Sequence, residues 1–303
     1  STWNVKELYL GGQDSMAGGT AHLEVRDHGS VVADQLVVWD GGAVQLNDGS
    51  LTASRIDHTH GGAFNFDDGR LEIGLFEGEL LNAGGILAPG PTTDIAQVTE
   101  HYFQLPGGVL EIELGGTDNG NPADPQYDVL AVDAVAAVGG TLDVRLIDAF
   151  VPSLGDAFEI VTAGTARLGT FADQLLPSLP SGLAWHVGYE PAAITLQVVD
   201  HGDFNADGGV DAADLVSWED HYGLPGLGGL ATDATGYEFL AWQSNQNATM
   251  SVAGLQNVPE PNTLLLWAAG ATSLYAARRR LTHGSAARAS LSPPSIPCLT
   301  PRA

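Results

Sequence analysis

Residues 203–214, with the sequence DFNADGGVDAAD, carry the most informative arrangement of polar groups in the chain. Oxygen donors stand at positions 1, 3, 5, 7, 9 and 12 of this stretch, and Gly208 provides a sharp turn at position 6. A loop with that spacing surrounds Ca²⁺ with oxygen ligands, whereas the alternative is a solvated acidic turn. Without a cation, carboxylates so close together would repel one another. The pattern predicts one calcium ion with the ligands Asp203, Asn205, Asp207, the Gly209 carbonyl, Asp211 (through water) and Asp214.

The loop leads directly into a predicted helix over 212–222. Asp211 is suited to cap its start, and Gly223 to end it. A second helix is expected further along, where Thr235 and Glu238 form the spacing of a capping box. The apolar residues expected to meet between the two helices are Leu215, Trp218, Tyr222, Phe239 and Trp242.

This duplicated loop–helix pattern, over about residues 201–246, resembles the type I dockerin module in the form found in exported proteins of the Planctomycete type. In dockerins both loops bind calcium and the helices dock on a cohesin partner. The resemblance implies the same calcium ligands and a cohesin-like partner. Residues 227–236, which correspond to the second loop, lack the acidic ligand set, so we expect one ion rather than two. A calcium-stabilised spacer is the alternative role.

A sorting signal is indicated by VPEPNTLLLWAAGATSLYAARRR (258–280). Its apolar run over 263–277 would be about 22 Å long as a helix, shorter than a usual membrane span. The order resembles the PEP-CTERM signal read by exosortase, which implies export, transient membrane contact through 263–277 and removal of the tail; a buried core helix is the alternative. The signal residues are Val258, Pro259, Glu260, Pro261, Arg278, Arg279 and Arg280.

Glycine-rich repeats occupy the N-terminal part of the chain. GGAVQLNDGSLTA (41–53) aligns with GGAFNFDDGRLEI (61–73) at an offset of 20 residues, and both alternate apolar and polar side chains. Units this short cannot bury an apolar face alone, so they are expected to stack as a parallel β-solenoid. Because Asp-Gly also favours hairpins, an antiparallel meander is the alternative. The positions predicted to face inward are Val44, Leu46, Leu51, Phe64, Phe66 and Leu71.

Residues 84–199 remain rich in predicted strands and resemble the Gly-rich β-repeats related to autotransporter passengers, on GGILAPGP, GGVLEIELGG–YDVLAV and GGTLDVRLIDAFVPSLGDAFEIV. That resemblance implies an extracellular β-rich scaffold. The expected fold class is therefore mainly β, followed by a small α-helical calcium module and a C-terminal hydrophobic helix. The expected divisions are 1–90 (β-repeat solenoid), 91–200 (β-rich domain), 201–248 (dockerin-like module), 258–281 (sorting segment) and 282–303 (disordered tail).

Composition excludes several function classes. With 37 acidic and 11 basic residues the net charge is −26, so the chain has no basic surface for nucleic acid. The single cysteine excludes a cysteine-based zinc site. The His58-Thr59-His60 sequence beside Asp57 could hold a metal, and pairs such as Asp67-Asp68 could serve glycoside hydrolysis, but both patterns are common in acidic loops.

The sequence thus predicts an exported protein of the cell envelope, cell surface or extracellular matrix, with a structural, adhesive or partner-docking role. No catalytic residues are assigned, and an enzyme is not favoured. The alternative is a carbohydrate-active β-helix enzyme (polysaccharide lyase or glycoside hydrolase) or a protein that binds an extracellular polysaccharide. Lys6 is the only lysine, which argues against a lyase acting on acidic sugars.

Overall fold

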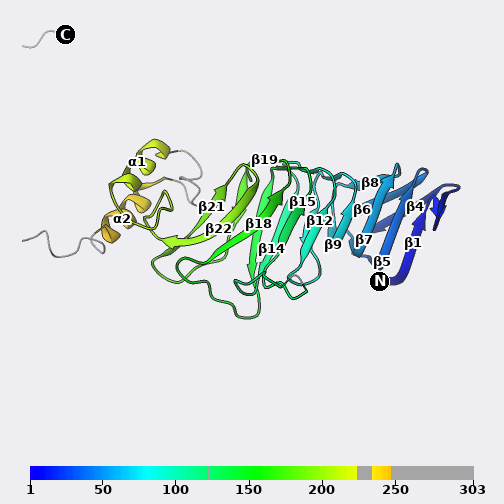
Figure 1. Cartoon of the computed structure of the whole chain (residues 1–303), viewed down its shortest axis with the longest axis horizontal. Coiled ribbons are helices and arrows are strands. Elements are labelled where there is room, and N and C mark those ends of the chain that lie inside the picture. Colours follow the sequence, from blue (N-terminus) through cyan, green and yellow to red (C-terminus); the bar gives the residue numbers. More distant parts are fainter. Residues whose placement is uncertain (122, 224–233, 247–303) are drawn as a thin grey trace, which may run out of the picture. The chain divides into compact units, whose positions relative to one another are not determined.

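The computed structural model describes residues 1–121, 123–223 and 234–246. Over these residues the chain is mainly β, as predicted: strands follow one another from Thr2 to Asp200, and two helices come after them. Figure 1 shows the strands following one another along the molecule, with the blue N-terminal strands at one end and the green ones next to the helices.

Parallel pairing dominates the largest sheet, which begins with β1 (Thr2–Leu10), β5 (Ser30–Trp39), β7 (Ser50–His60) and β9 (Arg70–Glu77). Ser30 of β5 lies opposite Ser50 of β7, which in turn lies opposite Arg70 of β9. Each neighbouring strand is therefore the equivalent segment of the next 20-residue repeat. The antiparallel meander is wrong for these residues, because each of these strands runs parallel to its neighbours.

The sheet divides at β9. Residues 70–73 pair with one strand and residues 75–76 with another, on either side of the loop at 90–94. The first branch is β11 (Ile86–Pro89), β14 (Val109–Leu114), β17 (Thr141–Leu146) and β20 (Asp173–Leu175). The second branch is β12 (Ile95–Val98), β15 (Val129–Val132), β18 (Ala157–Ala163), β22 (Ala193–Asp200) and β21 (Leu183–Tyr189). The last two strands pair antiparallel, so the hairpin β21–β22 ends this branch.

Smaller sheets complete the β region of the described residues. One parallel sheet is formed by β4 (Ala21–Arg26), β6 (Gly42–Asn47) and β8 (Ala63–Phe66). A second parallel sheet is formed by β10 (Leu80–Asn82), β13 (Tyr102–Gln104), β16 (Val135–Val138) and β19 (Ala166–Gly169). The third is a short hairpin of β2 (Gly12–Gln13) and β3 (Met16–Ala17).

Asp-Gly pairs form stacked turns between strands rather than hairpin tips. Gly69 has a φ of +77°, a conformation that favours glycine, and the Asp68 carboxylate accepts a hydrogen bond from its amide at 2.6 Å. A Cβ on Gly69 would lie 2.5 Å from the Gly49 carbonyl oxygen of the neighbouring repeat. Glycine is therefore required here for both the turn and the close stacking.

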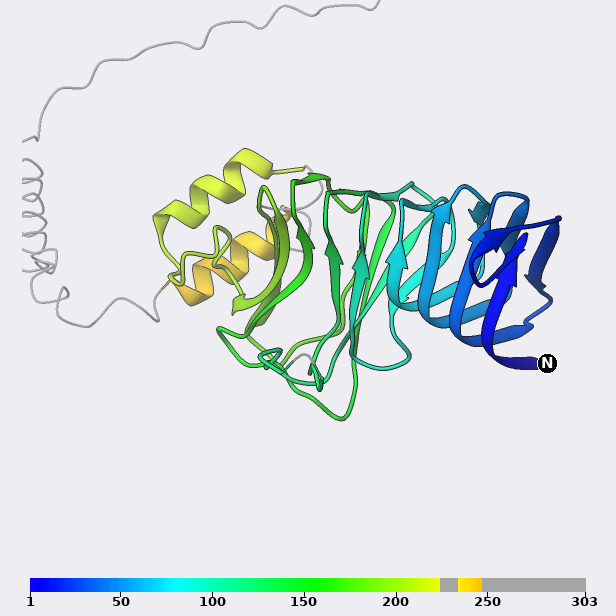
Figure 2. The same ribbon diagram turned by 45° about the vertical axis from the view of Figure 1, so that its right-hand side comes forward.

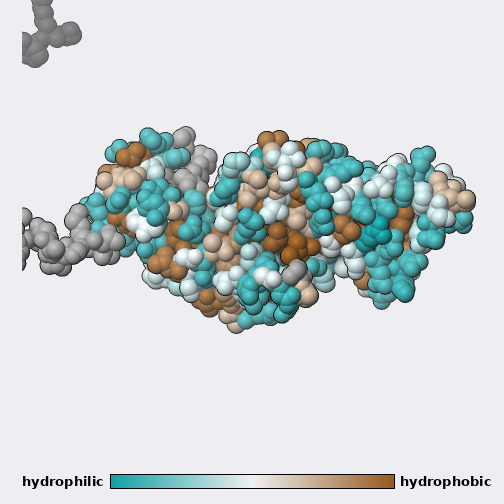
Figure 3. Space-filling view, viewed as in Figure 1, coloured by the Kyte–Doolittle hydropathy of each residue, from teal (hydrophilic) through white to brown (hydrophobic). Residues whose placement is uncertain are grey.

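Alternation along the strands buries one side of each. Five of the six predicted inward residues, Val44, Leu46, Leu51, Phe66 and Leu71, are at most 1% exposed. Phe64 is only partly buried, because its ring packs on the rings of His58 and Phe76 near the edge of the core. One hydrophobic core runs from Leu10 to Val198, and the described residues belong to one compact unit. On the face seen in Figure 3, hydrophilic residues predominate and hydrophobic ones form separate patches.

The two helices are α1 (Ala212–His221), close to the predicted range of 212–222, and α2 (Gly236–Asn245), which follows Thr235 as predicted. Asp211 caps α1 and Thr235 caps α2, and each start is a capping box completed by Asp214 and Glu238 respectively. The predicted caps are thus confirmed. Within the described residues, neither helix is long and apolar enough to cross a membrane.

Candidate functional site

The predicted calcium loop lies between β22 and α1, and its first carboxylate faces inward. Asp203 is 2% exposed and accepts hydrogen bonds from the amides of Asp207, at 3.2 Å, and Gly208, at 3.0 Å. Gly208 has a φ of +89°, which provides the sharp turn expected at this position. The chain therefore winds around the Asp203 carboxylate.

The last carboxylate of the loop is buried beside the first. Asp214 is fully buried; its Oδ1 accepts from the amides of Phe204, at 2.7 Å, and Asn205, at 3.1 Å. Its Oδ2 accepts from the Asp211 amide at 2.8 Å, which completes the cap of α1. Asp214 is therefore both the last predicted ligand of the loop and the residue that completes the capping box of α1.

The buried Asp203 carboxylate ionises less readily than a solvent-exposed aspartate. Burial raises the pKa of Asp203 to about 6, and the neighbouring Asp214 and Asp207 carboxylates contribute to the increase. Hydrogen bonds from the Gly208 and Asp207 amides act in the opposite direction. A cation beside Asp203 would favour its ionised form.

The remaining predicted side-chain ligands are exposed. Asn205 donates from Nδ2 to Asp207 Oδ2 at 2.9 Å, and Asp207 Oδ1 accepts from the Gly209 amide at 3.0 Å. Asp211 Oδ1 accepts from the Ala213 amide at 2.7 Å. Among the described residues, no group of three or more His, Cys, Asp or Glu side chains is arranged to hold a metal ion. The donor set fits a hard cation in its chemistry, since all its groups bind through oxygen.

A small hydrophobic core includes two residues of the loop, Phe204 and Val210. Its buried members are Val199, Phe204, Val210, Ala234 and Trp242. Trp218 of α1 packs on Phe239 of α2 with ring centroids 5.1 Å apart, so the predicted contact between the helices is present. Tyr222 contacts Trp218 but remains 62% exposed.

The two histidines of the His58-Thr59-His60 sequence do not converge on a common point. His58 Nε2 lies 2.8 Å from the Gly62 carbonyl oxygen. His60 stacks on the indole of Trp39, with centroids 3.9 Å apart, and its Nε2 lies 3.4 Å from an Asp57 carboxylate oxygen. Both rings therefore serve local packing.

A network of ion pairs crosses the outer face of the sheet, and sequence reasoning missed it. Glu111 on β14 is buried, and its two carboxylate oxygens lie 2.6 Å from Arg70 and 2.7 Å from Arg145. Arg70 also pairs with Glu72 at 2.7 Å. The partners are brought together by strand register alone, so no local sequence signal points to them.

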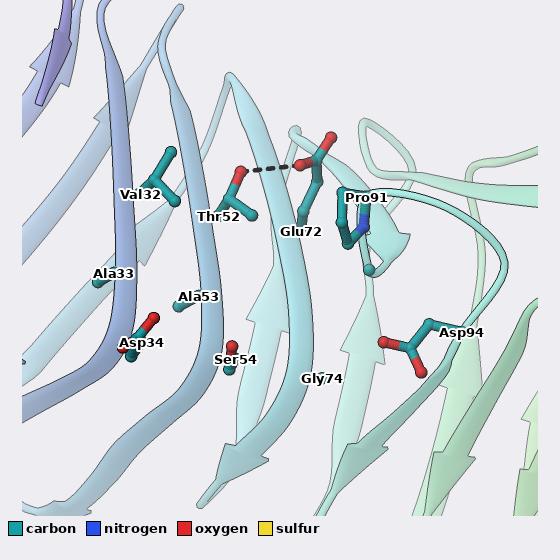
Figure 4. A pocket seen from close by; sticks show the side chains of 11 residues that line it. Val32, Ala33, Asp34, Thr52, Ala53, Ser54, Glu72, Gly74, Pro91 and Asp94 are labelled. Atoms are coloured by element: carbon teal, nitrogen blue, oxygen red, sulfur yellow. Dashed lines mark hydrogen bonds between the residues drawn. The ribbon is translucent and has the colours of Figure 1, made fainter. Parts of the chain in front are cut away.

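Next to this network lies a groove of about 400 Å³ on the outer side of β5, β7 and β9 (Figure 4). Thr52 on β7 donates to the carboxylate of Glu72 on the neighbouring strand β9 at 2.8 Å. The loop that carries Pro91 and Asp94 forms one wall of the groove. None of the described residues that line the groove is basic. The groove therefore presents hydroxyl groups and carboxylates to solvent.

A second buried carboxylate was also missed, because Asp128 reads as an ordinary residue at the start of a strand. It is 1% exposed and accepts hydrogen bonds from the amides of Asp94, at 2.8 Å, and Glu113, at 2.7 Å. Burial raises its pKa to about 8, with the Glu113 and Asp94 carboxylates adding to the effect. Asp128 thus joins the two branches of the sheet beyond the fork.

The predicted sorting residues, at 258–261 and 278–280, lie outside the described residues, as does most of the second loop at 227–236. Comparison with protein-family models and with curated proteins finds no match to this chain.

Proposed function

We propose that this chain is an exported scaffold protein of the cell surface or extracellular matrix, with a structural, adhesive or partner-docking role. The observation that carries the proposal is the in-register parallel pairing of glycine-rich 20-residue repeats. Such stacking supports a β-solenoid, an architecture that offers long surfaces without requiring a reaction centre. The strongly negative net charge favours a solvated, extracellular setting over one that contacts nucleic acid.

The second part of the proposal is a dockerin-like module that binds one Ca²⁺. Asp203, Asn205, Asp207, Gly209, Asp211 and Asp214 would hold the ion, which would supply charge neutralisation to the buried pair Asp203 and Asp214. Support comes from the sharp turn at Gly208 and from the winding of the loop amides around Asp203. The helices would then be available to a cohesin-like partner.

The third part is processing of the tail by exosortase-type machinery. We expect the mature surface form to lack the apolar run and the arginines after it, because cleavage near 258–261 would release the chain from the membrane. Intact mass spectrometry of native protein from the cell-surface fraction tests this. A mature species that retains Trp267 and Arg278–Arg280 would contradict it and would indicate a permanent anchor or a core helix instead.

A second candidate function, binding of an extracellular polysaccharide, is favoured by the groove beside Thr52 and Glu72. Sugar hydroxyls can donate to carboxylates and exchange hydrogen bonds with Thr52 and Ser54. The absence of basic side chains among the described lining residues favours neutral over acidic sugars. We assign no reaction to this groove.

One capture experiment separates the two candidates. The full chain is immobilised and exposed to secreted proteins and neutral polysaccharides, with and without calcium. A docking protein should retain a protein partner only with calcium. A polysaccharide bound in the groove should be retained with or without calcium. Ser54→Phe, at an exposed residue of the groove, should abolish this retention. The control Thr59→Phe, at an exposed residue of the same strand outside the groove, should keep it. Retention of polysaccharide by Ser54→Phe would exclude the groove.

A further inference from the structure

The hairpin β21–β22 has hydrophobic residues on both faces. Trp185 and Val187 of β21, with Ile194, Leu196 and Val198 of β22, belong to the main core. Ala184 and Val199, which lie opposite each other in the hairpin, instead pack in the small core with Phe204, Val210 and Trp242. One face of the hairpin therefore packs in the main core and the other face packs in the small core.

Hydrogen bonds tie the same elements together. The His201 amide donates to the Gly182 carbonyl at 2.8 Å, and Asn245 of α2 donates from its side chain to the His201 carbonyl. Trp242 donates from Nε1 to the Asp211 carbonyl at 2.5 Å, which connects α2 to the end of the calcium loop. Hydrogen bonds thus link the hairpin, the loop and α2, and Figure 2 shows the two helices beside the last strands of the sheet.

The backbone between β22 and the loop allows very close approach of α2. Gly202 is buried with a φ of +120°, and a Cβ there would lie 2.9 Å from the Trp242 Cα. A side chain at this position would push α2 away from the hairpin. Gly202 is thus a contact point between the helix and the sheet, next to the first predicted ligand, Asp203.

We propose that the calcium loop and the hairpin β21–β22 form one cooperative unit, in which calcium binding stabilises the last strands of the main sheet. This rests on the calcium site proposed above. Two apolar side chains of the loop, Phe204 and Val210, are buried, and both belong to the same small core as Val199 of the hairpin. Any loosening of the loop would therefore uncover one face of the hairpin.

Hydrogen–deuterium exchange of the full chain, measured in calcium and in chelator, tests the coupling. Peptides covering 183–200 should exchange up to about 100-fold more slowly when free calcium is about 100 times its Kd, because opening of the hairpin would require loss of the ion. Peptides covering 42–77, which are distant in the sheet order, should show the same exchange in both conditions.

Variants separate this coupling from calcium binding itself, which isothermal titration calorimetry measures independently. Val199→Ala and Gly202→Ala should still bind calcium but lose most of the protection at 183–200, whereas Gln197→Ala, on the same strand but outside both cores, should keep it. Calcium binding without slower exchange at 183–200 would overturn the coupling and leave the site intact. If no calcium binds, the site and the coupling are both wrong.

Discussion

Replacing Phe66 with aspartate should destabilise the chain by several kcal/mol, on the order of the whole stability of a typical domain. Phe66 is 1% exposed, and its ring fills the space left by Gly85, where a Cβ would overlap the ring at 2.0 Å. An aspartate in this position would bury a charge with no cation beside it. Urea unfolding followed by far-UV circular dichroism should show a much lower midpoint or no cooperative transition.

Asn65→Asp is the matched control, since it introduces the same charge one residue away on the exposed side of β8. The free energy of unfolding of that variant should lie within about 0.5 kcal/mol of the parent chain's, as is usual for exposed substitutions. Equal midpoints for the two aspartate variants would mean that position 66 is not in the core.

Calcium binding should give a stoichiometry near one per chain and should disappear when Asp203 and Asp207 are both replaced by alanine. The two changes remove the carboxylates at positions 1 and 5 of the loop, together with the acceptors around which the Asp207, Gly208 and Gly209 amides are arranged. Calorimetry measures the stoichiometry. Tryptophan fluorescence, compared with a Trp218→Phe variant, reports whether the contact between α1 and α2 changes.

The control for this pair is Asp40→Ala with Asp67→Ala, which removes two exposed carboxylates outside the loop. It should leave calcium binding unchanged, since it alters the net charge by the same amount without touching a ligand. A stoichiometry of two, or tight binding that survives the loop substitutions, would show that the ligand assignment is wrong.

Local patterns predicted the β class, the inward residues and both helix caps because the signals for these features lie within about 20 residues. The period of 20 residues places equivalent side chains in register, so Leu51 and Leu71 could be assigned to one face from the sequence. Phe64 lies opposite Val44 and packs against the same core, but alternation alone does not show that it stays only partly buried, where its ring contacts His58.

Features that depend on contacts between distant residues could not be predicted. Arg70 and Glu111 are 41 residues apart, and their ion pair exists only because β9 divides and β11 lies between β9 and β14. The contact between Gly202 and Trp242 likewise depends on how α2 returns to the hairpin. In the predicted calcium loop, the spacing predicted a set of oxygen donors, but the burial of Asp203 and Asp214 could be seen only in the structure.

The 20-residue offset between the paired strands β5, β7 and β9 has a consequence for how the chain reaches its native state. Closing a loop of that length costs about 2 kcal/mol less entropy than closing one ten times longer, and contacts between near neighbours favour rapid folding from any point of nucleation. A chain that emerges N-terminus first during synthesis can therefore add these strands one after another. The antiparallel hairpin β21–β22 would be added last, and it closes between residues only a few positions apart, such as Tyr189 and Ile194.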